Sequence, residues 1–424
     1  MMSMRERSLA VFPAGSNGEF NLPPEMAMVI AGGEGCRLTD TDGNEYLDFS
    51  MGWGSVLVGH GRAEVADAVR RQATRGSNFA YVTENALRVA EEIVRLSPAA
   101  DRVRFCASGT EATMYCMRLA HAYTGRPRML KFEGAYHGAN AVGVTSLFPE
   151  RPPDYPRPDP TSAGIAHEVA DWVLVAPYND LEATARIVAG HARTLAGIIV
   201  EPLHRCTPPA PGFLEGLRDL TRDQGALLIF DEVVTGFRLA YGGAQEYYGV
   251  VPDLVAYGKA LGGGYPIGAF GGRADIMDLM REDRMGADDY VWAASTLGGN
   301  PVSAAAAEAA LGVFAKAGTY DRLRALGEYL RTGLRRVLGE RRITAQVIGD
   351  GPLAQVVFSP DAVRDYRSAR RGDPGKGRRL MLGLFKRRVF LNPMGTKLYL
   401  SLAHDEAVCD EFLDRFAHVL TELG

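Results

Sequence analysis

Short apolar runs alternate with longer stretches of helical spacing between about residue 61 and residue 305. Each run is followed by a turn and then by a segment whose apolar positions recur at helical spacing. Runs of this kind lie at residues 103–106, 129–132, 198–200, 227–230, 254–257 and 267–270. Strands that are apolar throughout need cover on both faces. The pattern therefore predicts an α/β fold in which helices flank a mostly parallel central sheet.

The two ends of the chain lack this alternation. Residues 1 to about 60 indicate irregular structure and short strands, with Gly43-Asn44 as the turn of a hairpin. A long helix is expected from residue 304 to about residue 337, and a terminal helix over residues 405–423 follows some short strands. These features are typical of a second, smaller α+β domain built from the chain ends.

We therefore expect three regions in a chain of 424 residues. They are an N-terminal segment at residues 1–60, a large domain at residues 61–305 and a C-terminal small domain at residues 306–424. One segment of the large domain breaks the alternation, because residues 149–160 contain six prolines and cannot form a helix interior or a central strand. This segment is expected to be a long loop, either a surface excursion or a lid near the site.

The composition is ordinary for a soluble globular protein, with 46% hydrophobic and 23% charged residues. A net charge of −4 gives no basic field for nucleic acid. The five cysteines are dispersed without a CxxC pair, which argues against a disulfide framework and against a zinc site. No apolar run reaches the length of a membrane span or of a signal segment. We expect a cytoplasmic protein without a bound metal, a nucleic-acid partner or a membrane partner.

In open α/β sheets, ligands bind just beyond the carboxyl ends of the strands. A Ser-Gly-Thr sequence at residues 108–110 follows one predicted strand and precedes a helix that extends to about Tyr123. The N–H groups at such a helix start can bind phosphate, although a serine there is also an ordinary N-cap. Asp231 follows another predicted strand directly. Because a buried carboxylate needs a partner, Asp231 could bind a metal, act as a base or pair with a protonated ring nitrogen.

Two further strand ends carry reactive or aromatic side chains. Lys259 follows a predicted strand and lies between Gly258 and a run of three glycines. Partial burial lowers the pKa of a lysine and makes it a nucleophile toward carbonyl groups, while the alternative is a solvated surface lysine. Tyr136 and His137 lie beside glycines after a fourth strand. They could stack on a planar ring or simply form a turn.

Together these four strand ends meet the needs of one cofactor, pyridoxal 5′-phosphate (PLP). PLP requires a phosphate anchor, an amine for its aldehyde, a carboxylate at its pyridine nitrogen and an aromatic ring against its face. The carboxylate keeps the ring protonated, and the lysine forms a Schiff base and then moves a proton. We predict a PLP enzyme that moves amino groups, with Lys259 as its catalytic residue. A non-catalytic protein on the same fold would have no need of this lysine.

Long motifs in the same order resemble the class III aminotransferases of PLP fold type I. The resemblance is strongest to the branch that holds glutamate-1-semialdehyde 2,1-aminomutase and the ω-aminotransferases, and it covers nearly the whole chain. It is carried by SGTEAT (108–113), KFEGAYHG (131–138), GALLIFDEVVTGFR (225–238), GKALGGGYPIGAFGG (258–272) and STLGGNP (295–301). The resemblance implies a large PLP-binding domain, a smaller domain and PLP as the cofactor.

The resemblance also implies a role for each matched residue. Lys259 would form the Schiff base, and Asp231 would pair with the pyridine nitrogen. Tyr136 would stack on one face of the ring with His137 beside it, and Val233 would pack on the other face. The cofactor-binding residues implied in this way are Ser108, Gly109, Thr110, Tyr136, His137, Glu201, Asp231, Val233, Lys259 and Thr296.

Thr296 carries an implication for assembly. It matches a threonine that reaches the phosphate of the neighbouring subunit in the family. The resemblance therefore implies a homodimer with sites at the interface, to which residues 1–60 contribute.

Several segments that would face the substrate depart from the aminomutase pattern. Ala107 replaces an asparagine, and residues 203–206 (LHRC) replace small residues and an asparagine. Residues 139–142 replace a glycine-rich segment, and residues 17–21 lack an arginine. The cofactor residues are spared. This favours a ping-pong aminotransferase, acting between an amino acid or amine and an oxo acid or aldehyde, over the alternative of intramolecular transfer by an aminomutase. The candidate substrate residues are Trp53, Arg205 and Lys397.

Overall fold

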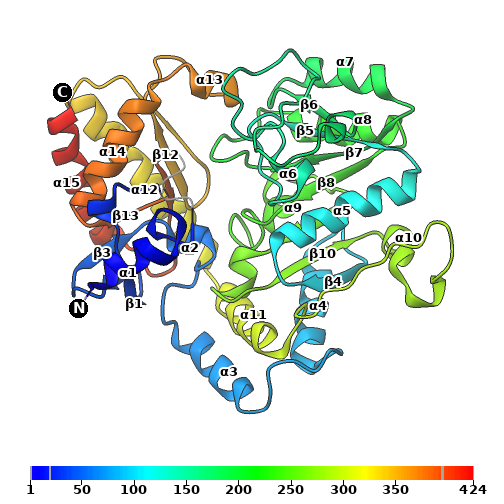
Figure 1. Cartoon of the computed structure of the whole chain (residues 1–424), viewed down its shortest axis with the longest axis horizontal. Helices are drawn as coiled ribbons and strands as arrows, with labels where there is room; N and C mark the ends of the chain where they lie inside the picture. The colour runs from blue at the N-terminus through cyan, green and yellow to red at the C-terminus, as the bar shows by residue number, and fades with distance from the viewer. Residues whose placement is uncertain (1, 19–20, 393–395, 424) are drawn as a thin grey trace. The chain divides into compact units, whose positions relative to one another are not determined.

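The computed structural model describes residues 2–18, 21–392 and 396–423. The chain divides into two compact units (Figure 1). The large unit comprises Asp67–Ala315 and Arg364–Tyr366, and the small unit comprises Met1–Ala66, Lys316–Val363 and Arg367–Gly424. The small unit thus takes its residues from both ends of the chain, drawn in blue and in yellow to red in Figure 1.

A seven-stranded sheet forms the centre of the large unit, with the order β4-β10-β9-β8-β7-β5-β6. Neighbours from β9 through β8, β7 and β5 to β6 are parallel, whereas β10 runs antiparallel to both β4 and β9. The bounds are β4 Arg102–Cys106, β5 Arg128–Phe132, β6 Val173–Ala176, β7 Leu195–Val200, β8 Leu227–Asp231, β9 Leu254–Tyr257 and β10 Gly268–Gly272. The prediction of a mostly parallel sheet is confirmed, and all six apolar runs form strands.

One strand of this sheet was not expected. Strand β6 is fully buried but follows the proline-rich segment and a short 3-10 helix (His167–Asp171) instead of a longer helix, so it lies outside the alternation from which the other strands were predicted. Residues 149–160 form neither helix nor strand, as their prolines predicted.

Helix α5 (Gly109–Thr124) packs against β4 and against β7 to β10. It begins at the N-cap Ser108 and ends at Gly125, whose φ of 64° is the left-handed conformation that glycine adopts freely at a helix end. The other helices of this part of the chain are α3 Ala63–Ala73, α4 Glu84–Leu96, α6 Ala141–Val144, α7 Leu181–His191, α8 Phe213–Asp223, α9 Gly243–Tyr248, α10 Ala274–Met277 and α11 Pro301–Phe314. Helices α7 and α8 pack against each other and against β6 to β8.

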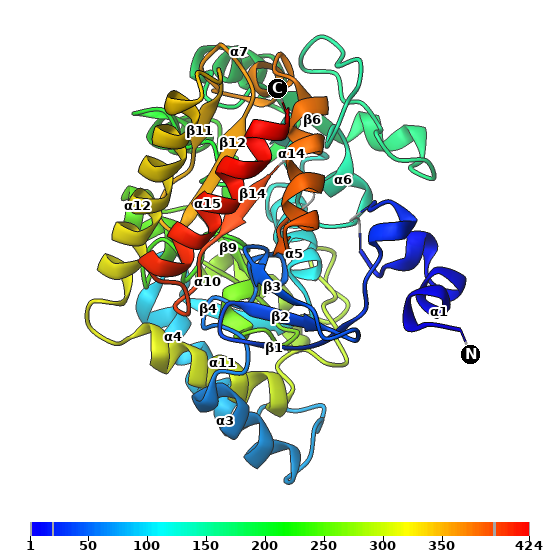
Figure 2. The same ribbon diagram turned by 90° about the vertical axis from the view of Figure 1, so that its left-hand side faces the viewer.

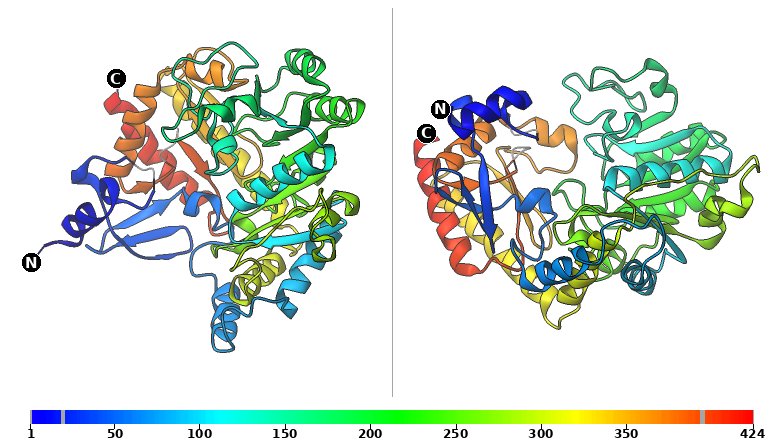
Figure 3. Two further views of the ribbon diagram at one scale, coloured as in Figure 1. Left: turned by 45° about the vertical axis from the view of Figure 1, so that its right-hand side comes forward. Right: turned by 60° about the horizontal axis from the view of Figure 1, so that its bottom comes forward.

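The small unit contains two sheets, ordered β1-β2-β3-β13 and β11-β12-β14. Their strands are β1 Ile30–Glu34, β2 Arg37–Asp40, β3 Glu45–Asp48, β11 Gln346–Ile348, β12 Leu353–Val357, β13 Val389–Phe390 and β14 Lys397–Tyr399. The hairpin predicted at Gly43-Asn44 is confirmed, since β2 and β3 pair antiparallel on either side of it (Figure 3, left, in blue). The Asp40 carboxylate accepts the Asn44 backbone N–H at 2.8 Å and so closes this turn.

The helices of the small unit are α1 Met4–Val11, α2 Met51–Gly54, α12 Thr319–Glu340, α14 Pro374–Lys386 and α15 Glu406–Leu423. Helix α13 Tyr366–Arg370 begins at a residue of the large unit and continues in the small unit. Figure 2 shows α12, α14 and α15 side by side along the β11-β12-β14 sheet. Their apolar faces bury a common core that includes Leu330, Leu334, Leu384, Phe412 and Phe416. The predicted terminal helix is confirmed as α15.

Two expectations about helices were wrong. The single helix expected over residues 304–337 is two helices, α11 and α12, because Gly318 adopts φ 77° and starts a new helix. Helix α1 was not expected, because its sequence has little apolar periodicity. It does carry a start signal, since Ser3 and Glu6 form a reciprocal capping box. Among the described helices, none has the combined length and apolarity that crossing a bilayer requires.

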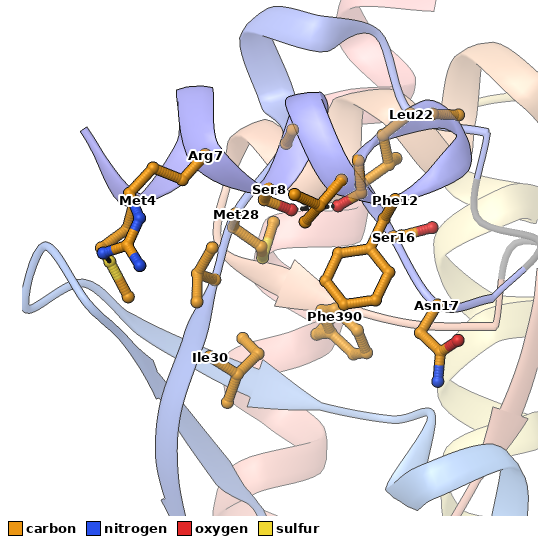
Figure 4. Close-up of a pocket in the computed structure, with 15 residues that line it drawn as sticks. Met4, Arg7, Ser8, Phe12, Ser16, Asn17, Leu22, Met28, Ile30 and Phe390 are labelled. Atoms are coloured by element: carbon orange, nitrogen blue, oxygen red, sulfur yellow. Dashed lines mark hydrogen bonds between the residues drawn. The ribbon is translucent and has the colours of Figure 1, made fainter. Parts of the chain in front are cut away.

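A pocket of about 440 Å³ lies within the small unit beside α1 and β1 (Figure 4). Met4 and Arg7 lie at one end of it, and Phe12, Asn17 and Phe390 lie at the other. None of the residues predicted for PLP or substrate binding lines this pocket. All the residues that line the pocket belong to the small unit.

Candidate active site

The predicted phosphate loop lies at the start of α5. Ser108 caps the helix, because its Oγ accepts the Glu111 N–H at 3.2 Å and also donates to Glu111 Oε2 at 3.1 Å. Ser108 is therefore an ordinary N-cap and also lies in the segment predicted to bind phosphate. The Ser108 hydroxyl is engaged by its own helix. A phosphate bound here would depend mainly on the backbone N–H groups of the first turn and on the positive end of the helix dipole.

Three strand ends that are distant in the sequence meet beside this loop. A Cβ on Gly109 would lie 2.7 Å from Val233 Cγ1, and a Cβ on Gly258 would lie 3.3 Å from the same atom. That Gly258 position is also 3.5 Å from the Gly109 Cα. A side chain at residue 109 would collide with Val233, and one at residue 258 would be a tight fit, so the two glycines with Val233 form a shallow cradle.

Asp231 ends strand β8 and is 5% exposed. Its Oδ2 lies 2.8 Å from His137 Nδ1, and its Oδ1 accepts the Val233 N–H at 3.1 Å. His137 is 1% exposed and is itself held by Thr113 Oγ1, which donates to its carbonyl at 2.7 Å. A buried carboxylate is stable when it is paired in this way. Residual lone pairs on Asp231 can accept a further donor such as a ring N–H.

The neighbouring carboxylate, Glu232, has a different environment. It accepts bonds from the N–H groups of Ala244 and Gln245, from the Gln245 amide and from the Thr235 hydroxyl, at 2.5 to 3.2 Å. Burial raises its pKa, and these four donors lower it in part. Glu232 therefore stabilises the start of α9, while Asp231 has capacity for a ligand.

Lys259 begins a short 3-10 helix (Lys259–Gly262) directly after β9 and Gly258. It is half-buried and adopts φ 43°, in the left-handed region that few residues other than glycine occupy. Ala256, three residues earlier in β9, pairs with Asp231 in the neighbouring strand β8. Strained backbone at such a position is typical of functional sites.

The loop after β5 carries Tyr136 and His137 and is pinned by a lysine that the sequence analysis missed. Lys131 is fully buried, and its Nζ donates to the carbonyls of Ala135, Gly143 and Thr145 at 3.0, 2.8 and 2.6 Å. Burial lowers the pKa of Lys131 to about 7, and the charges of Glu201 and Asp231 offset part of that effect. A lysine within a strand that is otherwise apolar was the available signal.

Glu201 ties this loop to the segment after β7. Its Oε1 accepts the Tyr136 N–H at 3.3 Å, and its Oε2 accepts the Arg205 N–H at 3.1 Å. Burial lowers the pKa of the adjacent His204 to about 4, so this imidazole is neutral at pH 7. The structure thus places Glu201 as a brace behind Tyr136, which is 36% exposed and presents its ring to solvent.

Within the large unit, the structure brings most of the predicted residues together. Thr296 is exposed, and its carbonyl accepts the Asn78 side-chain N–H at 3.1 Å. Trp53 and Lys397 belong to the small unit. Trp53 lies in α2 with φ 57°, and Lys397 is 7% exposed with its Nζ 4.9 Å from the centre of the Tyr399 ring.

The residues of the large unit fit PLP. A buried carboxylate, a lysine on the adjacent strand end, a glycine cradle and a helix N-terminus lie at one edge of a mostly parallel sheet, as in PLP enzymes of fold type I. The chain belongs to the class III aminotransferases, whose family model matches residues 22–420. The aminotransferases and the aminomutases of this family are both PLP-dependent enzymes. PLP is therefore the cofactor of this chain.

Individual relatives support this family assignment. The chain is 38% identical to the glutamate-1-semialdehyde 2,1-aminomutase of Methanothermobacter thermautotrophicus, over 98% of each chain. An omega-transaminase from Sphaerobacter thermophilus has a similar structure, with a TM-score of 0.93 and 34% identity over 99% of this chain and 97% of that chain. A transaminase with PLP bound gives a TM-score of 0.88 with 28% identity, over 99% of this chain and 96% of that one.

Proposed function

We propose that this enzyme is an aminotransferase that moves an amino group between an amino acid or amine and an oxo acid or aldehyde by a ping-pong mechanism. The observation that carries this proposal is the segment at residues 203–206. It departs from the aminomutase pattern and is tied by Glu201 directly to the Tyr136 loop. A site with unchanged cofactor residues and a changed substrate side is typical of the same chemistry applied to a different substrate.

The residues of the chain divide the work. PLP, when bound, supplies an aldehyde for the amino group and a ring that accepts electrons. Lys259 holds the cofactor through its Nζ and, once released, takes and returns the proton at the substrate Cα. Asp231, oriented by His137, keeps the proton on the pyridine nitrogen. Gly109 and Thr110 bind the phosphate with their backbone N–H groups, and Val233 and Tyr136 enclose the ring.

Intramolecular transfer by an aminomutase is the second candidate. It is supported by the relative that is 38% identical over nearly the whole chain and bears the name glutamate-1-semialdehyde 2,1-aminomutase. Both reactions use the same residues for the cofactor, so the cofactor site does not separate them.

Separate half-reactions distinguish the two. The PLP-loaded enzyme is incubated with a panel of amino donors and no acceptor, and the cofactor absorbance and the oxo product are followed. A ping-pong aminotransferase converts one equivalent of donor per site and stops until an oxo acid is added. Complete conversion of glutamate 1-semialdehyde to its isomer without a second substrate would instead establish the aminomutase.

We also propose a homodimer in which Thr296 reaches the neighbouring site. The segments around Thr296 and Asn78 expose large apolar side chains, including Tyr81, Val82 and Trp292. An exposed apolar patch of this kind is typical of a surface covered by a partner. The cytoplasmic location stays a prediction.

A further inference from the structure

Arg205 adopts an unusual backbone conformation beside the Tyr136 loop. Its φ is 60°, in the left-handed region, where a side chain is strained and glycine is favoured. The residue nevertheless carries a long cationic side chain. Strain of this kind persists when the surrounding structure enforces it, and it is concentrated where a side chain must point in a required direction.

The Arg205 guanidinium is hydrogen-bonded at Nε and unpaired at Nη2 within the described residues. Its Nε donates to the Gly134 carbonyl at 2.9 Å, and the group lies 5.5 Å from the centre of the Phe148 ring. Its Nη2 is buried and has no hydrogen-bond partner among the residues that the structure describes. Tyr366 packs on the other side of Gly134, where a Cβ would lie 2.7 Å from its ring. The Arg205 guanidinium therefore lies near the ring of Phe148, and its Nη2 donor has no acceptor among the described residues.

Charges near Arg205 do not satisfy it. Glu201 accepts the backbone N–H of Arg205 and not its guanidinium. Within residues 2–18, 21–392 and 396–423, no carboxylate comes within 4.0 Å of the guanidinium nitrogens. His204 is neutral at pH 7 because burial lowers its pKa to about 4, and Lys131 directs its Nζ to three carbonyls. A half-buried guanidinium with an unpaired N–H is able to bind an external anion.

We infer that Arg205 binds the carboxylate of the substrate and so restricts this enzyme to amino or oxo acids over simple amines. The planar fork of a guanidinium matches a carboxylate in a way that an ammonium does not. The Arg205 side chain donates to the Gly134 carbonyl in the loop that carries Tyr136. A substrate joined to the cofactor ring would therefore present its carboxylate on the side of the ring where Arg205 lies. This inference rests on the proposed function, in that it takes the strand ends described above as the reaction site.

The test compares two donor pairs in which a methyl group replaces the carboxylate. The pairs are 3-amino-3-phenylpropanoate with 1-phenylpropylamine, and alanine with isopropylamine. In Arg205→Met, kcat/KM for the carboxylate donors should fall by about 100-fold or more, while the value for the amines should change by less than about threefold. Arg205→Lys should recover part of the loss because it restores charge without the fork.

Arg126→Met is the matched control. Arg126 is also half-buried in the large unit, and its Nη1 donates to the carbonyls of Leu195 and Gln224 at 3.1 and 2.8 Å. The substitution removes the hydrogen bonds of Arg126 to two backbone carbonyls and removes no donor proposed to bind the substrate. It should therefore change kcat/KM for both members of each pair by the same factor.

Calorimetric titration with 3-phenylpropanoate, which has no amino group, tests the inference without turnover. The PLP-loaded wild type and Arg126→Met should bind it, and Arg205→Met should bind it at least about tenfold more weakly. Equal binding by all three proteins, no binding by the wild type, or an equal loss for amines and carboxylate donors would overturn the inference. If binding follows Arg205 but no donor in the half-reaction panel reacts, the inference stands and the proposed function fails.

Discussion

The proposed cofactor side and the proposed substrate side of the site differ in which of their polar groups form hydrogen bonds within the protein. On the cofactor side, Asp231 Oδ2 lies 2.8 Å from His137 Nδ1, and Lys131 Nζ donates to three carbonyls, while the far ring nitrogen of His137, Nε2, has no partner among the described residues. On the substrate side, the cationic donor Nη2 of Arg205 has no partner within the same part of the chain. Polar groups that form hydrogen bonds within the protein hold the backbone and side chains in one geometry, whereas an unpaired donor is able to bind a ligand. The comparison teaches that the two sides should respond differently to substitution.

The largest effect is expected at Lys259. Lys259→Ala should abolish the absorbance of the covalently held cofactor and lower turnover by at least about four orders of magnitude, because it removes both the amine and the proton carrier. Absorbance spectra and steady-state rates measure the two effects. Lys386→Ala, an exposed lysine of the small unit, serves as the control and should leave both unchanged. Free turnover by the Lys259 variant would contradict the whole account of the cofactor side.

The two adjacent buried carboxylates give the next prediction. Asp231→Asn keeps the shape but removes the charge that holds a proton on the pyridine nitrogen, so kcat should fall by about 100- to 1000-fold. Glu232→Gln is the matched control, because Glu232 is bonded to α9 and Thr235 instead. It should lower the melting temperature while leaving kcat of the folded enzyme within about threefold. Equal losses of kcat in both variants would show that Asp231 acts only through the fold.

Much of the fold and part of the site could be predicted from the sequence. Runs of apolar residues identify strands locally, and each strand end points to the residue after it, which is how Lys259 and Asp231 were found. The bond between His137 and Asp231 joins residues 94 positions apart, and no local pattern encodes it. The role of Lys131 likewise depends on the carbonyls of Ala135, Gly143 and Thr145, which lie near its Nζ only in the folded chain. The antiparallel direction of β10 could not be predicted either, because its apolar run is the same in both directions.

Lys131 tests whether the cofactor side is rigid because it is satisfied. Lys131→Met leaves the carbonyls of Ala135 and Thr145 without the lysine donor, while the Gly143 carbonyl keeps the His137 N–H, and each unsatisfied buried group costs about 1–3 kcal/mol before relaxation. We expect a lower free energy of unfolding and a PLP affinity reduced by about tenfold. Urea unfolding and titration of the apoenzyme with PLP measure these. Lys316→Met, which removes only an exposed pair with Glu64, should change neither. An unchanged PLP affinity would show that the loop holds Tyr136 without this lysine.

The smallest effect is expected from pH, and it extends the comparison to both units. Burial lowers the pKa of His204 to about 4, with Glu201 opposing this and with Arg205, His137 and Lys131 adding to it. An unfolded histidine titrates near pH 6.5, so between about pH 6.5 and 4 the unfolded chain binds more protons than the folded chain. The neutral His204 therefore makes its whole contribution to the free energy of unfolding above about pH 6.5. That contribution falls by up to about 1.4 kcal/mol per pH unit as the pH drops from about 6.5 to 4.

His204→Gln should therefore flatten the decline of the unfolding free energy between about pH 6.5 and 4, whatever it does to the stability at neutral pH through the lost stacking on Tyr178. His404 of the small unit is the matched comparison, because burial also lowers its pKa to about 4. His404→Gln should flatten the same curve by a similar amount. Only His204→Gln should also alter the binding of 3-phenylpropanoate, since His204 adjoins Arg205 and Glu201. A steeper curve in His204→Gln, measured by urea unfolding across this pH range, would mean that the imidazole is charged in the folded enzyme.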